Sequence, residues 1–165
     1  MSTTTTINVQ RVSIVSPKPF DEVVRRVTAT LGQPDLRAFH DALVAATTVA
    51  ELEQTVHGAI GASGLMEFGR FDAGDVLRKG TDGRGPKLLR LLVGNPLIMK
   101  DMARRVADAA AYAPITILVD ERPDGVHLAF DSMASLLAPY GDDAAVAVAR
   151  DLDAKVGALL EAAAR

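Results

Sequence analysis

The stretch from residue 88 to residue 131 constrains the fold of this chain more than any other. It begins with an apolar run, LLRLLV, that ends in Gly94-Asn95-Pro96. Asn95 suits the capping position of a helix, and Pro96 suits its first turn, where a missing N–H costs no hydrogen bond. Two more apolar runs, ITILVD and VHLAF, flank the turn sequence ERPDG. The stretch therefore predicts strand, helix, strand, turn and strand, on which the rest of the chain packs.

The first residues predict one strand and one helix. Apolar residues alternate over 7–15, as in a strand with a bulge near Gln10, and the threonine-rich residues 1–6 are expected to form a disordered tail. Apolar residues with helical spacing follow between Ser16 and Gly32, where the glycine ends the helix.

The next segment predicts a helical hairpin over residues 35–60, with its break at Thr47-Thr48. Thr48 and Glu51 match a capping box, which marks the start of the second helix. Alternation then predicts another strand over 65–71. Residues 72–87 are rich in glycine, proline and basic side chains, a composition typical of a mobile surface loop that is often functional.

The last third of the chain predicts helices around the strand hairpin. The helix that begins at Pro96 is expected to reach Ala107, Ser132 caps a short helix, and Asp142 opens a long helix to about Ala163. This order predicts a single α+β domain over residues 1–165. We expect a mainly antiparallel sheet of about five strands covered by helices, with an added helical hairpin near residues 35–60.

Composition excludes several classes of function. The 165 residues include no cysteine, which removes disulfides, thiolate metal sites and a cysteine nucleophile. The net charge of −3 provides no basic field for a polyanion, so no nucleic-acid partner is expected. The N-terminus lacks the pattern of a secretory signal and no apolar run is long enough to span a bilayer, so we expect a soluble cytoplasmic protein without membrane contact.

Three segments carry a family resemblance: GLMEFGRFDAGDVLRK, LLRLLVGNPLIMKDMA and YAPITILVDERPDGVHLAFDSMASLLAPYG. In this order, over roughly Leu65 to Leu160, they resemble the bacterial and archaeal family called domain of unknown function 302. The resemblance implies a compact α+β domain that associates as a homodimer. It implies no particular biochemical activity.

Two features of the chain depart from that resemblance. The hairpin over residues 35–60 looks like an addition relative to shorter members, so no role of His40 or His57 follows from the family. Gly94 stands where some members carry a cysteine before the Asn-Pro pair. Thiol chemistry is therefore absent from that position.

The two hairpin histidines are candidate metal or haem ligands. His40 falls in the apolar stripe of its helix, and His57 lies about 100° from the centre of the next stripe. In a tight antiparallel hairpin the two histidines would lie at similar distances from the turn and therefore side by side. Two imidazoles there could hold haem or a divalent metal. The alternative is that both are ordinary histidines at the edge of the core, bonded to backbone carbonyls.

The Gly94-Asn95-Pro96 turn is a candidate anion site. A helix N-terminus offers free N–H groups and the positive end of the helix dipole, and Lys87 and Arg90 precede it. A phosphate or carboxylate could bind there. The alternative is that Asn95 and Pro96 serve only to start the helix.

A third candidate site lies on the last strand. His127 and Asp131 share one face of it and could bracket a bound molecule as acid–base groups, or could simply lie on a solvated face. Tyr112 and Tyr140 each adjoin a proline segment and could cover a pocket or only pack.

Two hypotheses of function follow. In the first, the chain is a homodimeric binding protein that holds haem or another planar or apolar ligand between helices and sheet. In the second, it is an enzyme acting on a small anionic metabolite. Arg90 and Asn95 would then bind the anion, and His127 with Asp131 would transfer protons. Taken together, the candidate ligand-binding residues are Arg90, Asn95, Tyr112 and His127.

The expected homodimer also has a physical argument. The strand over 7–15 carries few charges and no proline, so nothing in it discourages pairing at an exposed sheet edge. The alanine-rich helix from Asp142 offers a second close-packing surface. We expect an apolar interface larger than about 1,000 Å².

Overall fold

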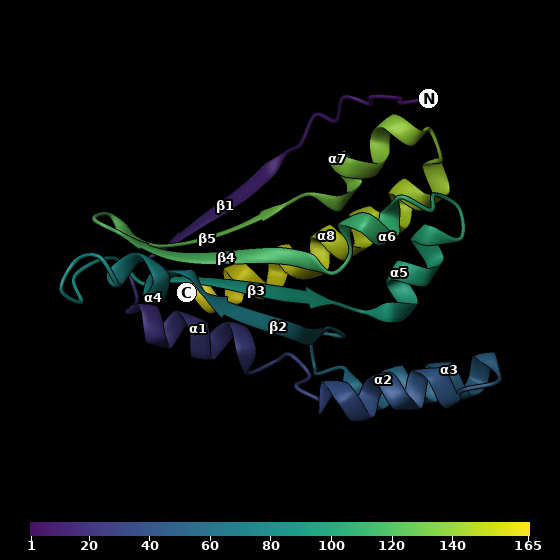
Figure 1. Ribbon diagram of the computed structural model, residues 1–165, viewed down its shortest axis with the longest axis horizontal. Helices are drawn as coiled ribbons and strands as arrows, with labels where there is room; N and C mark the ends of the chain where they lie inside the picture. Colours follow the sequence, from purple (N-terminus) through teal and green to yellow (C-terminus); the bar gives the residue numbers. More distant parts are fainter.

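The computed structural model describes residues 1–165 and contains one five-stranded antiparallel sheet with helices packed on it (Figure 1). The strand order across the sheet is β1-β5-β4-β3-β2. The strands are β1 (Arg11–Ser16), β2 (Met66–Asp72), β3 (Leu88–Gly94), β4 (Ile115–Arg122) and β5 (Gly125–Asp131). The helices are α1 (Phe20–Thr28), α2 (Leu36–Ala45), α3 (Val49–Ala59), α4 (Ala73–Arg78), α5 (Pro96–Ala103), α6 (Ala109–Tyr112), α7 (Met133–Leu137) and α8 (Asp143–Ala164).

The core lies between one face of the sheet and the helices α1 and α8. Alternation along the strands decides which side chains enter it, because successive residues of a strand point to opposite faces. Leu91 of β3, Ile117 of β4 and Leu128 of β5 are fully buried there against Val27 of α1 and Leu160 of α8. None of the helices is both long and apolar enough to cross a membrane.

The opposite face of the sheet has no helical cover. Figure 1 shows α8 behind the sheet, α5, α6 and α7 at one end of it, and no helix across the front of β3, β4 and β5. Leu118, Arg90 and Ala129 point to this side, since they alternate with the buried residues and lie opposite one another in the register.

The helices α2 and α3 form a hairpin outside the main core, with their own apolar cluster of Phe39, Val56, Ala59 and Met66. The two ends of the hairpin meet: the N–H groups of Gly32 and Gly61 both donate to the carbonyl of Leu65, each at 2.9 Å. Only glycine fits at this crossing. A Cβ on Gly32 would lie 1.8 Å from the carbonyl oxygen of Ala59.

Most of the predicted fold is confirmed. The α+β class, the antiparallel sheet and the hairpin of β4 and β5 are as expected, and so are the two helices over 35–60. The capping box is present, with the Thr48 hydroxyl and the Glu51 carboxylate bonded to each other's backbone N–H groups.

Four details of the predicted fold were wrong. The first strand begins at Arg11, because its partner β5 ends opposite it at Asp131, and no strand remains to pair with residues 7–10. The only register shift lies in β2, between Glu67 and Gly69, not near Gln10.

The other two errors concern helices. The helix from Pro96 ends at Ala103, since the chain turns there and directs Val106 and Ala109 into the core. The predicted loop over 72–87 contains α4, which is capped by the side chain of Asp72.

Candidate functional site

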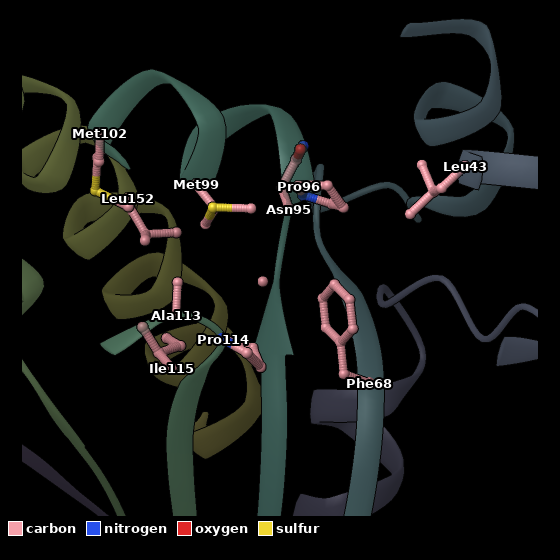
Figure 2. A pocket seen from close by; sticks show the side chains of 11 residues that line it. Leu43, Phe68, Asn95, Pro96, Met99, Met102, Ala113, Pro114, Ile115 and Leu152 are labelled. Atoms are coloured by element: carbon pink, nitrogen blue, oxygen red, sulfur yellow. The ribbon is translucent and has the colours of Figure 1, made fainter. Parts of the chain in front are cut away.

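An apolar pocket lies at the end of β3, between the sheet and three helices (Figure 2). Its volume is about 180 Å³. Figure 2 shows Met99, Pro114 and Phe68 around one space, with Leu43 of α2 on one side and Leu152 of α8 on the other. The lining residues are Leu43, Phe68, Gly94, Asn95, Pro96, Met99, Met102, Ala113, Pro114, Ile115 and Leu152.

The Gly94-Asn95-Pro96 turn builds one wall of this pocket. The Oδ1 atom of Asn95 accepts a hydrogen bond from the N–H of Leu97 at 2.8 Å and so caps α5. Its Nδ2 atom donates to the carbonyl of Gly64 at 2.9 Å and ties the turn to the start of β2. Asn95 therefore holds the wall in place from both ends of its amide group.

The rest of the lining is apolar and carries no titratable side chain. Met99 and Met102 contribute thioethers, which contact aromatic rings favourably and adapt to irregular shapes. An apolar cavity of about 150 Å³ suffices to hold benzene. The pocket can therefore accept a neutral ligand of about one ring, and it offers no acid or base to act on that ligand.

The two hairpin histidines lie apart from this pocket. His40 shares a face of α2 with apolar residues, but that part of the face is not buried: the His40 side chain is 73% exposed, and its Nδ1 atom is 3.8 Å from an oxygen of Asp41. His57 is also exposed. Neither lines the pocket, although Leu43 of the same hairpin does. A haem or metal site at His40 and His57 stays a prediction. The structure contains no group of three or more His, Asp or Glu side chains arranged to hold a metal ion.

The residues proposed to bind an anion are not brought together. Asn95 lies at the pocket, whereas Arg90 lies on the open face of the sheet. Asn95 comes five positions after Arg90 along the strand, which corresponds to about 17 Å. The guanidinium of Arg90 contacts Thr116 Oγ1 at 3.4 Å, and a shallow depression there is bordered by Arg11 and Asp131.

His127 and Asp131 share the open face but have separate partners. Both oxygens of Asp131 accept from Arg11, at 2.7 and 2.9 Å. The Nε2 atom of His127 lies 2.9 Å from Asp124 Oδ1, and this hydrogen bond is the main reason that the pKa of Asp124 is lowered. Their proposed acid–base role stays a prediction; the shallow depression that Asp131 borders does not include His127.

Tyr112 and Tyr140 contact each other rather than the pocket. Their hydroxyl oxygens are 2.9 Å apart, and this hydrogen bond, with Asp108 nearby, raises the pKa of Tyr140 well above its ordinary value. The pair links α6 to the turn after α7. The ligand-binding role of Tyr112 stays a prediction.

Sequence reasoning found the turn but missed most of the pocket. One local signal was available, because Met99 and Met102 are spaced by three residues on the helix after the turn and so lie on one face. Leu43, Phe68 and Leu152 carry no such signal. They come from elements that are far apart in the chain and meet only in the fold.

Comparisons with known proteins agree with this fold. No curated protein matches the chain. A crystal structure of an uncharacterized conserved protein DUF302 from Bacillus stearothermophilus is similar, with 13% sequence identity and a TM-score of 0.64 over 94% of this chain and 98% of that one. The family model "Domain of unknown function DUF302" matches residues 42–163. The chain therefore belongs to the DUF302 family.

Proposed function

We propose that this protein is a small homodimeric binding protein for a neutral, apolar ligand of about one aromatic ring. The observation that carries the proposal is the pocket at the end of β3, with its volume of about 180 Å³ and its lining free of charge. Pockets for drug-sized ligands are larger, about 300 to 1,000 Å³. A single ring fits the volume, and haem would have to bind elsewhere.

The lining favours an aromatic ligand over an aliphatic one. Met99 and Met102 both line the pocket; Met99 points into the space that the ring of Phe68 borders, and Met102 lies beside Leu152 (Figure 2). Sulfur contacts and offset ring contacts each add about 0.5 to 1.5 kcal/mol beyond the burial of surface. A ring bound here would lie close to both methionine methyl groups.

The test is a titration followed by NMR with protein labelled at the methionine methyl groups. The chain has five methionines, and Met1 and Met133 do not line the pocket. Benzene and indole are expected to shift the methyl signals of Met99 and Met102 with saturation, and to leave those of Met1 and Met133 in place.

A blocking variant tests the position of the ligand. A Cβ on Gly94 would lie 3.4 Å from Pro114 Cβ and 3.6 Å from Phe68 Cε2, so Gly94→Ala adds a methyl group to the pocket without a clash. We expect binding weaker by about tenfold, which corresponds to about 1.4 kcal/mol and lies within the usual cost of overpacking. Gly69→Ala is the matched control, because a Cβ there meets no atom within 4 Å.

Two results would count against the proposal. If no apolar probe shifts Met99 and Met102 selectively, the pocket does not bind such ligands. If protein expressed with haem shows a Soret band that His40→Ala or His57→Ala removes, the ligand is haem at the hairpin instead.

Two surfaces of the sheet that have no partner within the chain support the dimer. One is the outer edge of β1, and the other is the face of the sheet opposite α1 and α8. An edge strand or an apolar face that is left uncovered is a ready site for contact with another chain. Light scattering at micromolar concentration tests this part: twice the chain mass of 17.4 kDa is expected, and a mass of one chain would contradict it.

A further inference from the structure

The open face of the sheet carries an apolar surface that no part of the chain covers. Five apolar residues point outward from the strands and are exposed or half-buried: Val15, Phe71, Leu88, Leu92 and Leu118. A sixth outward residue, Ala129, is only 7% exposed. Phe71 is 56% exposed and Val15 is 48% exposed. An antiparallel sheet with one solvated face normally carries polar residues there. Apolar side chains gathered on such a face indicate contact with another molecule.

The charges on this face are balanced. Arg11 is paired with Asp131 and Arg122 with Asp120, while Asp124 is bonded to His127. Arg90 is the exception, since it lies in the middle of the face with only the Thr116 hydroxyl as a partner. With three arginines and three aspartates, this face carries no net charge that would repel a copy of itself.

From this we infer that the second copy of the proposed dimer docks on the open face of the sheet rather than at the edge of β1, and that Arg90 then meets the β5 strand of the other copy. The inference rests on the proposed homodimer and names its interface. A twofold interface requires the same patch to be complementary to itself. A face without net charge is compatible with that requirement.

The strand order provides the contact for Arg90. β4 is the middle strand of the sheet, with β3 on one side and β5 on the other. A twofold axis that runs along β4 exchanges these neighbours and lays β3 of one copy over β5 of the next. Arg90 lies at the same level as Ala129 of β5, two residues from Asp131. Each Arg90 would thus gain a carboxylate nearby.

The area is sufficient for a specific contact. Five strands of about seven residues form a flat patch of roughly 24 by 24 Å, or about 570 Å². Two such patches together bury about 1,100 Å², which exceeds the roughly 1,000 Å² expected of a biological interface. Pairing of two six-residue β1 edges would leave the apolar surface exposed to water.

Two pairs of variants test this interface, with mass measured by light scattering and folding by far-UV circular dichroism. Leu118→Glu places a charge on the middle strand, far from either sheet edge, and Leu36→Glu makes the same change on an exposed part of α2. Arg90→Glu places a carboxylate near Asp131 of the other copy, so that two negative charges meet across the interface. Arg37→Glu makes the same change on α2 and is the control.

We expect the wild type, Leu36→Glu and Arg37→Glu to have twice the chain mass. Leu118→Glu should be a folded monomer, and Arg90→Glu should raise the dissociation constant at least tenfold. If the wild type is a monomer, both the dimer and this inference are wrong. The NMR titration of Met99 and Met102 would still test ligand binding independently. If the wild type is a dimer and both Leu118→Glu and Arg90→Glu keep its affinity, the dimer stands and the open face is not its interface.

Discussion

Replacing Asp153 of α8 with alanine removes the carboxylate that accepts the hydrogen bonds at the N-terminus of α7. The carboxylate of Asp153 accepts from the hydroxyl of Ser132 at 2.6 Å, from the N–H of Met133 at 2.8 Å and from the N–H of Ala134 at 3.1 Å. Met133 is fully buried, so water cannot take over its N–H. This one side chain therefore joins two helices that follow each other in the chain.

The cost follows from the groups left without a partner. Each buried N–H without an acceptor costs about 1 to 3 kcal/mol, and Ala134 is only half-buried. We expect a loss of about 2 to 4 kcal/mol in the free energy of unfolding, from a total of about 5 to 15 kcal/mol for a domain. The melting temperature should fall by roughly 4 to 16 °C.

The assay is urea unfolding followed by far-UV circular dichroism at one protein concentration, since the stability of a dimer depends on concentration. Asp151→Ala is the matched control, because Asp151 lies on the same helix, is exposed and makes no side-chain hydrogen bond. Asp153→Asn keeps one oxygen and should lose less than Asp153→Ala. If Asp153→Ala and Asp151→Ala agree within about 0.5 kcal/mol, the reasoning about α7 is refuted.

Three further predictions concern single side chains. A Cβ on Gly157, in the middle of α8, would meet no atom within 4 Å. Gly157→Ala should therefore raise the free energy of unfolding, measured in urea, by about 0.5 to 1 kcal/mol. A lower free energy of unfolding for this variant would contradict the prediction. Gly61→Ala should cost about 1 to 3 kcal/mol or more in the same assay, because its Cβ would lie 2.2 Å from the carbonyl oxygen of Thr30, whereas Gly58→Ala meets nothing and should be tolerated. Hydrogen bonds from Thr47, backbone first, and Thr48 lower the pKa of Glu51, so its contribution is present above the unfolded pKa of about 4.3 and is lost as the pH falls below it. The urea midpoint of the wild type should therefore fall more steeply with acidification than that of Glu51→Gln, and equal slopes would contradict this.

The predictions that succeeded depend on residues close together in the chain. A cap forms when a side chain reaches an N–H two or three residues later, as Asn95, Thr48 and Asp142 do. The turn between β4 and β5 is equally local. Such features could be predicted from the sequence because few other arrangements satisfy the same short segment.

The error at His40 shows where periodicity stops being informative. Leu36, Phe39, Leu43 and Val44 have helical spacing with His40, yet only Phe39 is buried. The helix α2 packs on α3 and on the start of β2, outside the main core, so too few neighbours exist to cover its whole apolar side. Spacing predicts which residues share a face but not how much of that face finds a partner.

The sequence by itself determined the order of the elements, their caps and turns, and the two alternating sets of side chains on each strand, because these depend on interactions over a few residues. Only the tertiary structure decided which set faces the helices and which remains open. It also brought Leu43, Phe68, Met99 and Leu152 to one pocket. Side chains separated by more than a hundred residues meet only when the sheet and helices pack, and nothing local in the chain specifies that contact.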